Sequence, residues 1–287
     1  MFFDPAGQGG SAGSILCDRD MTVNVDGIDV SYISEGSVMA PHTVVILQGW
    51  GTDMSVYESI SSFIVSESSD HRVIRLDLPG FGETAEPERA WNIDEYADFF
   101  IRFLTALEVR SCILLGHSYG GRIIIKLASR DKKDIPFSIE KLILLDSAGL
   151  KAEKTFKQKC SILRYKFLKR LFKNDFVHQL APDMIDLWFS RQGSADYRNS
   201  TPIMKQAMVM AINEDLSDCL SKIPYETLLI WGEKDTATPL KDAEKMNSLI
   251  KKSGLSVIKN TGHYCFIEDI NTFRSIIRSY LFKQEEE

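Results

Sequence analysis

The chain has 287 residues, of which 44% are hydrophobic and 26% are charged, and its formal net charge is -6. These values are ordinary for a globular protein with one large α/β domain and an insertion, or with two small domains. The negative charge gives no reason to expect a nucleic-acid partner. No apolar run approaches the length needed to cross a bilayer.

The first 20 residues and the five cysteines indicate the cellular compartment of the protein. Residues 1–20 are rich in Gly, Ser and Ala and lack the basic start and apolar core of a secretory signal, so we expect a flexible segment. The cysteines are scattered, odd in number and never in a CxxC pair, which argues against a disulfide framework or zinc site and for a reducing cytoplasm. Ligand spacings and phosphate-cradling glycine patterns are missing, so we expect no metal and no organic cofactor.

In chain order, apolar strands alternate with helices. Residues 21–34 alternate apolar and polar side chains around Asp26-Gly27, which predicts a β-hairpin. Further strands are predicted at residues 43–47, 73–78, 112–115, 141–145, 227–231 and 256–258. Helices are predicted at residues 92–107, 121–129, 239–252 and 271–282. This alternation predicts a doubly wound, mainly parallel α/β sheet of about eight strands, with functional groups at the carboxyl ends of the strands.

The alternation stops between Leu150 and Ile223. Apolar residues recur at helical spacing from residue 160 to 172, and Ser200-Thr201-Pro202 is a typical helix start. The apolar face predicted for the following helix consists of Met204, Ala207, Met208, Ala211 and Ile212. We therefore predict a helical cap over residues 150–223, inserted after the sixth strand, with residues 21–149 and 224–287 forming the core.

Residues 116–120, Gly-His-Ser-Tyr-Gly, lie between a predicted strand and a predicted helix. A serine in this context is typical of a nucleophile elbow. We expect the flanking glycines because a Cβ at either position would clash with the neighbouring strand or helix. The Ser118 oxygen would then lie above the sheet, with the next backbone N–H directed at a developing oxyanion and His117 facing away.

A catalytic serine needs a base, and the base needs an orienting group. Asp235 lies in the loop after the predicted strand at 227–231, and His263 directly follows the last predicted strand. Asp146 also ends a predicted strand and is the alternative acid, although we interpret it as structural.

Five segments occur in an order that resembles the α/β-hydrolase fold superfamily. They are LQGWG, RLDLPGFGET, LLGHSYGGRI, LIWGEKDTATP and TGHYCFIED. The resemblance covers the chain from about residue 21 to the C-terminus and points to the capped branch that contains small esterases and C–C bond hydrolases. It implies that Ser118 is the nucleophile, His263 the general base and Asp235 the acid that orients the imidazole.

The resemblance also implies an oxyanion hole built from the backbone N–H groups of Trp50 and Tyr119. The family usually has His-Gly where this chain has Gln48-Gly49. Because the hole uses backbone donors, Gln48 need not abolish it, but its detailed geometry stays open.

Aromatic residues and methionines predict the character of the substrate pocket. Tyr264 flanks the predicted nucleophile, and Trp188, Met204 and Met208 come from the insert. Such a lining suits an apolar acyl or aryl group. The alternative is that the insert's apolar residues pack its own helices.

Nine basic residues lie between Lys151 and Lys173, and we interpret them as a solvated face, with a membrane contact or an anionic substrate as alternatives.

The leading hypothesis for function is a serine hydrolase that cleaves a small carboxylic ester through an acyl-enzyme. A C–C bond hydrolase, a thioesterase or a lactonase would use the same triad. A receptor that keeps the fold without turnover is the alternative from another class. We expect a small-molecule substrate, no nucleic-acid partner, no membrane contact, and a monomer or homodimer.

Overall fold

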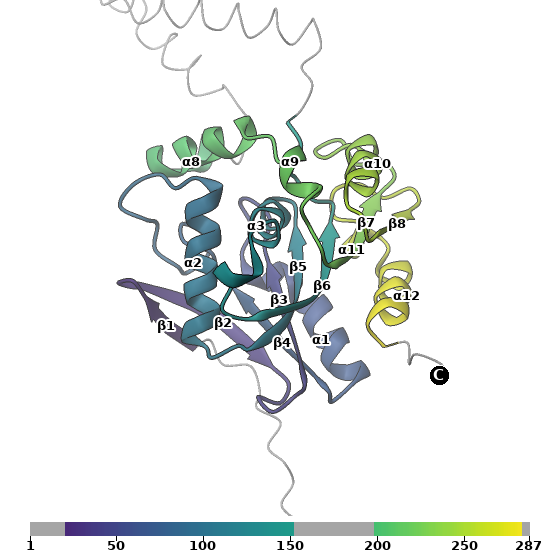
Figure 1. Ribbon diagram of the computed structural model, residues 1–287, viewed down its shortest axis with the longest axis horizontal. Helices are drawn as coiled ribbons and strands as arrows, with labels where there is room; N and C mark the ends of the chain where they lie inside the picture. The colour runs from purple at the N-terminus through teal and green to yellow at the C-terminus, as the bar shows by residue number, and fades with distance from the viewer. Residues whose placement is uncertain (1–20, 152–197, 283–287) are drawn as a thin grey trace, which may run out of the picture.

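The computed structural model describes residues 21–151 and 198–282 (Figure 1). Its centre is an eight-stranded sheet with the order β1-β2-β4-β3-β5-β6-β7-β8. The strands are β1 (Met21–Val25), β2 (Ile28–Glu35), β3 (His42–Leu47), β4 (His71–Leu76), β5 (Ser111–His117), β6 (Ser138–Leu145), β7 (Glu226–Gly232) and β8 (Ser253–Ile258). The pairs β1–β2 and β2–β4 are antiparallel, and the other pairs of the described sheet are parallel. The predicted fold class is thereby confirmed.

Helices lie against both faces of the sheet (Figure 1). They are η1 (Met54–Tyr57), α1 (Glu58–Glu67), α2 (Ile93–Ala106), α3 (Tyr119–Ala128), η2 (Lys132–Asp134), α8 (Pro202–Asn213), α9 (Ser217–Leu220), α10 (Leu240–Leu249), α11 (Cys265–Glu268) and α12 (Ile270–Leu281). Alternate side chains of β3 divide between two cores: Val45 and Leu47 pack with α2, α3 and α10, whereas Val44 and Ile46 pack with α1, α11 and α12. Burial on both faces explains why the central strands are continuously apolar.

The N-terminal hairpin forms where the sequence predicted it. Asp26 and Gly27 both have positive φ, 53° and 85°, as a two-residue hairpin turn with the right-handed strand twist requires. The pairing of Val25 with Ile28 closes the turn.

Some predicted elements need correction. Helix α3 begins at Tyr119 instead of residue 121, because Ser118 itself is the N-cap, and α10 ends at Leu249, three residues early. Helix α1 was not predicted. On α8, Ile212 is 58% exposed, because the helix rests on the core through a narrower stripe of Met204, Ala207 and Ala211.

Helices α8 and α9 follow β6 and lie at the end of the sheet where β5 and β6 finish (Figure 1). The Arg122 guanidinium of α3 donates to the Glu214 carbonyl at 2.8 Å, and Lys126 Nζ bonds the Glu214 carboxylate at 2.7 Å. The Leu216 N–H donates to the Gly149 carbonyl at 2.9 Å. These contacts fix the end of α8 on the core, while residues 152–197 of the predicted cap lie outside the described residues, as does most of the basic stretch at 151–173. The division into cap and core stays a prediction.

None of the helices within residues 21–151 and 198–282 combines the length and the apolar character needed to span a membrane.

Candidate active site

The predicted catalytic residues follow three strands of the parallel half of the sheet, β5, β7 and β8, at their carboxyl ends. Ser118 directly follows β5, Asp235 lies three residues after β7, and His263 lies five residues after β8. Because β5 to β8 run parallel and adjacent, their carboxyl ends bring these three residues together. Trp50 follows β3, the neighbour of β5 on its other side.

Ser118 has the backbone conformation of a sharp elbow. Its φ is 49° and its ψ is -107°, a region that non-glycine residues seldom occupy. The strain is held by two backbone hydrogen bonds to the end of β6 and the loop after it: the Ser118 N–H donates to the Leu145 carbonyl at 3.1 Å, and the Ser118 carbonyl accepts the Ala148 N–H at 2.9 Å.

The glycines on either side of Ser118 are sterically required, as expected. A Cβ on Gly116 would lie 2.6 Å from the backbone N of Gly121, at the start of α3. A Cβ on Gly120 would overlap the backbone oxygen of Leu47 in β3. The elbow can therefore approach both the strand and the helix only with glycine at these positions.

The three side chains form one hydrogen-bonded line. Ser118 Oγ lies 3.0 Å from His263 Nε2, and His263 Nδ1 lies 2.7 Å from Asp235 Oδ2. The Asp235 side chain is fully buried, whereas the side chain of His263 is 20% exposed. This is the geometry that lets an imidazole accept the serine proton while a carboxylate fixes its tautomer.

Asp235 is held as an anion. Burial alone would raise its pKa, but hydrogen bonds from His263 and Thr238 outweigh burial and lower the pKa below its ordinary value. Its Oδ1 accepts the N–H groups of Ala237 at 2.7 Å and Thr238 at 3.0 Å, and its Oδ2 accepts the Thr238 hydroxyl at 2.7 Å.

Asp146, the alternative acid, lies in a different environment. It is fully buried at the end of β6, and its Oδ1 accepts the Gly232 N–H at 2.8 Å. Burial raises the pKa of Asp146 to about 7, so this carboxyl is largely neutral in mildly acidic solution. It makes no hydrogen bond to His263 within the described residues. The structure supports the interpretation of Asp146 as structural.

The backbone N–H groups of Tyr119 and Trp50 are the predicted donors of an oxyanion hole, and this role stays a prediction. The Tyr119 N–H is the first of α3, so the positive end of the helix dipole adds to it. Trp50 follows Gly49, whose own N–H donates to the Tyr57 hydroxyl at 2.7 Å. Gln48 is buried and bridges the loop, donating to the Thr52 carbonyl at 3.2 Å and accepting the Leu78 N–H at 3.3 Å. Gln48 thus links the loop after β3, at Thr52, to the segment after β4, at Leu78.

Aromatic rings pack around Tyr119, the residue that follows Ser118. The Trp50 ring packs edge-on against both Phe81 and Tyr119, with centroids 5.0 Å apart in each case. The ring of Tyr96 packs edge-on against Tyr119 at 5.6 Å. These contacts give this side of the candidate site an apolar, aromatic character.

The predicted pocket residues occupy different places. Met204 is buried and packs on Gly80 and the Tyr96 hydroxyl, whereas Met208 is half-buried on α8. Tyr264 is 36% exposed, next to His263. Trp188 lies outside the described residues. Substrate contact by these four residues stays a prediction.

Two residues near the site were missed by sequence reasoning. Thr238 bonds Asp235 three positions earlier, and this Asp-x-x-Thr spacing is a local turn signal that could have indicated it. The Tyr57 hydroxyl lies 2.8 Å from His117 Nδ1, but 60 residues separate the two in the chain, and no sequence signal links them.

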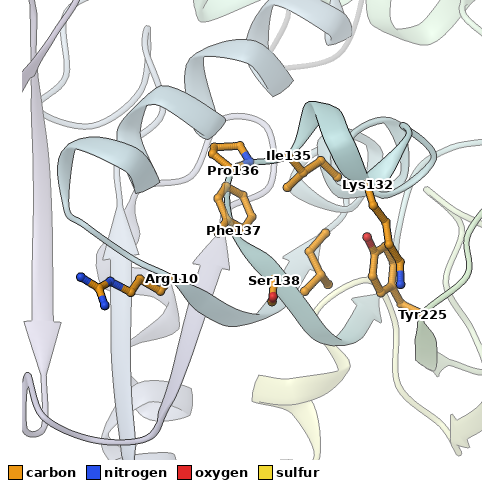
Figure 2. A pocket seen from close by; sticks show the side chains of 8 residues that line it. Arg110, Lys132, Ile135, Pro136, Phe137, Ser138 and Tyr225 are labelled. Atoms are coloured by element: carbon orange, nitrogen blue, oxygen red, sulfur yellow. The ribbon is translucent and has the colours of Figure 1, made fainter.

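A separate cavity of about 300 Å³ lies at the other end of the strands. Its lining includes Arg110, directly before β5, Ser138 at the start of β6, and Tyr225, directly before β7. Figure 2 shows Lys132 beside the Tyr225 ring, with Nζ 5.9 Å from the ring centroid. No histidine or carboxylate is among the described residues that line this cavity, so it lacks the base that Ser138 would need for catalysis.

Comparisons with known proteins agree with this architecture. A model of the alpha/beta hydrolase fold family matches residues 42–270. The chain is 25% identical over 259 residues to a 2-hydroxy-6-oxo-2,4-heptadienoate hydrolase of Pseudomonas putida, covering 86% of this chain and 92% of that protein. It is also 25% identical over 259 residues to a pimeloyl-[acyl-carrier protein] methyl ester esterase of Aliivibrio fischeri, covering 83% and 93%.

Among solved structures, an esterase from Exiguobacterium antarcticum has the same fold. Its TM-score is 0.70 at 22% identity, with 92% of this chain and 100% of the esterase covered. The family match spans most of the chain, including the residues that follow β5, β7 and β8. These matches identify the chain as a hydrolase that belongs to the alpha/beta hydrolase fold family.

Proposed function

We propose that the chain is a serine hydrolase that cleaves a small carboxylic ester through an acyl-enzyme. The observation that carries this proposal is the unbroken line of hydrogen bonds from Ser118 through His263 to Asp235, at 3.0 and 2.7 Å. An ordinary turn serine would have neither a base within hydrogen-bond distance nor an orienting carboxylate behind that base.

In the first half-reaction, Ser118 Oγ attacks the ester carbonyl carbon while its proton passes to His263 Nε2. Asp235 accepts the Nδ1–H and stabilises the imidazolium that forms. The N–H groups of Trp50 and Tyr119 donate to the carbonyl oxygen as it becomes negative. Collapse of the tetrahedral intermediate breaks the bond to the leaving alcohol, which takes the proton from His263.

In the second half-reaction, water replaces the alcohol. His263 Nε2 accepts a proton from the water as its oxygen attacks the acyl carbon of the acyl-enzyme. The bond between the acyl carbon and Ser118 Oγ then breaks, and His263 returns the proton to Ser118. The products are one carboxylic acid and one alcohol, and the enzyme is regenerated.

The neighbouring rings support an ester with an apolar acyl or aryl group. The rings of Trp50, Phe81 and Tyr119 pack against one another, and Tyr119 directly follows Ser118 in the chain, so apolar groups lie near the nucleophile. The Aliivibrio fischeri relative is named a methyl ester esterase, which is consistent with an ester substrate for this chain.

A second candidate is hydrolysis of a 2-hydroxy-6-oxo-dienoate, in which the bond that breaks is carbon–carbon. The relative from Pseudomonas putida, which is also 25% identical over 259 residues, carries the name of such a hydrolase. The same serine and histidine could serve both reactions, since each begins at a carbonyl carbon.

A substrate panel of esters, thioesters, lactones and 2-hydroxy-6-oxo-dienoates, run on the wild type and on Ser118→Ala, separates these candidates. We expect steady turnover of short p-nitrophenyl esters that falls by about 10⁶ in Ser118→Ala. We also expect a serine-directed fluorophosphonate to add one label at Ser118. Faster turnover of the dienoate than of every ester would favour the second candidate, and a single slow turnover without steady state would favour a receptor.

A further inference from the structure

Behind the elbow, Tyr57 and His117 join two loops that come from β3 and β8. The Gly49 N–H donates to the Tyr57 hydroxyl at 2.7 Å, and this hydroxyl lies 2.8 Å from His117 Nδ1. His117 Nε2 lies 2.9 Å from the backbone carbonyl oxygen of His263. Three consecutive hydrogen bonds therefore run from the residue before Trp50 to the backbone of the candidate general base.

The acceptor at the end of this line fixes the direction of each bond. A carbonyl oxygen carries no hydrogen, so His117 Nε2 must donate to His263. Burial lowers the pKa of His117 to about 3, so the ring is neutral and Nδ1 accepts the Tyr57 proton. The lone pairs of the Tyr57 hydroxyl remain for the Gly49 N–H. The Thr52 hydroxyl, 3.3 Å from Tyr57, gives its own proton to the Gly49 carbonyl at 2.9 Å.

Packing holds this line in place. Tyr57 and His117 are each 1% exposed. The Phe266 ring stacks on Tyr57 at 5.6 Å and meets the His117 ring edge-on at 5.3 Å. A Cβ on Gly49 would lie 2.8 Å from His117 Nδ1, so the loop that leads to Trp50 rests directly on the imidazole.

We propose that Tyr57 and His117 are positioning residues that couple the oxyanion loop at Gly49-Trp50 to the loop of His263, so that the oxyanion hole and the general base keep one fixed spacing around Ser118. This inference rests on the proposed function. His117 bonds the backbone of His263 and not its imidazole, so it transfers no proton in the reaction.

Such a link is needed because the loop of Gly49-Trp50 and the loop of His263 come from distant parts of the sheet. They follow β3 and β8, which are separated in the sheet by β5, β6 and β7. No direct hydrogen bond joins Gly49 or Trp50 to His263 in the described part of the chain. A displacement of about 1 Å between catalytic groups can cost 10²-fold in rate, so a rigid link between them is valuable.

Tyr57→Phe is the mildest test, because it removes one oxygen and keeps the ring. We expect kcat for a short p-nitrophenyl ester to fall by about 10- to 100-fold, below the full loss of an oxyanion donor, with KM little changed. Affinity for a trifluoromethyl ketone, which adopts the tetrahedral geometry, should weaken by the same factor, because the loss lies in the transition state. Tyr280→Phe is the matched control: its hydroxyl donates to the backbone carbonyl of Leu142 at 3.4 Å and takes no part in the bonds between Gly49 and His263, so this variant should match the wild type.

A double-mutant cycle with His117→Leu tests whether the two residues act as one device. If they do, the double variant should lose little more activity than His117→Leu alone. Additive losses in kcat, or a Tyr57→Phe variant with wild-type kcat and ketone affinity, would overturn the inference. If His117→Leu does not fold, the ketone affinity of Tyr57→Phe decides alone. A wild type that neither turns over esters nor takes the fluorophosphonate label would instead remove the proposed function, and the inference with it.

Discussion

The Asp146 carboxyl accepts the Gly232 N–H at 2.8 Å, which ties the end of β6 to the end of β7 directly beneath the loop that carries Asp235. Its second oxygen, Oδ2, is buried and has no hydrogen-bond partner in the described residues. One oxygen of Asp146 therefore holds the two strand ends together, while the burial of the other, unpaired oxygen raises the free energy of the ionised carboxylate.

Asp146→Asn should change how stability depends on pH. Burial raises the pKa of Asp146 to about 7 in the folded state, above its ordinary value of 3.8. The folded state thus holds a proton that the unfolded state releases, so Asp146 lowers stability progressively as the pH rises from about 4 to about 7. Asparagine cannot ionise, and its oxygen can still accept the Gly232 N–H. The variant should gain up to about 4 kcal/mol relative to wild type between these two pH values.

Urea unfolding at pH 4, 5, 6, 7 and 8 checks this prediction. Asp146→Ala serves as the control, because it also removes the ionisation but leaves the Gly232 N–H without an acceptor. It should therefore show the same pH slope as Asp146→Asn at a lower stability throughout. Parallel curves for the wild type and Asp146→Asn would contradict the raised pKa.

The sequence was sufficient to predict the sheet and the positions of the candidate triad, with Asp146 as an alternative acid. Ser118, Asp235 and His263 lie within five residues of the ends of predicted strands. Because the carboxyl ends of parallel strands lie at one edge of a sheet, this placement and the family resemblance together predicted that the three residues meet. The hairpin turn at Asp26-Gly27 followed from its two residues, both of which tolerate positive φ.

Other features depend on contacts that no local pattern encodes. Helix α1, with the sequence ESISSFIVSE, has four serines and three β-branched residues that weaken its helical signal. It forms because Ile60, Phe63 and Ile64 pack against the sheet. The choice between Asp146 and Asp235 depends on which loop reaches His263. The link between Tyr57 and His117 requires the three-dimensional fold.

Asp235→Asn should lower kcat by about 10⁴ with the fold intact. The asparagine oxygen can still accept the N–H groups of Ala237 and Thr238, so the loop should keep its shape. Its NH₂ group, however, would face His263 Nδ1 and favour the tautomer whose Nε2–H points at Ser118, which cannot accept the serine proton. Steady-state kinetics check the loss in kcat, and thermal unfolding checks that the fold is intact. A fall in kcat of less than about 10-fold would exclude Asp235 as the orienting acid.

Gly120→Ala should destabilise the protein by about 3 kcal/mol, because its Cβ would overlap the backbone oxygen of Leu47, which cannot move without shifting β3. Gly254→Ala is the matched control. Its Cβ would meet nothing within 4 Å, so we expect a change of less than about 1 kcal/mol. Urea midpoints for the two variants give the comparison. Equal midpoints would mean that the elbow is not packed as tightly against β3 as the structure has it.

Gln48→Met should weaken both stability and catalysis. Methionine keeps most of the buried volume, but it leaves the Thr52 carbonyl and the Leu78 N–H without their present partner. Each group left unpaired costs about 1–3 kcal/mol. Because these two bonds brace the loop between Gly49 and Thr52, the Trp50 N–H should lose its fixed direction, and kcat should fall more than KM rises. Gln48→Glu is the control, since its carboxyl retains an acceptor for the Leu78 N–H and should keep more activity than methionine does. If Gln48→Met instead had wild-type kcat at reduced stability, Gln48 would stabilise the fold without acting on the oxyanion hole.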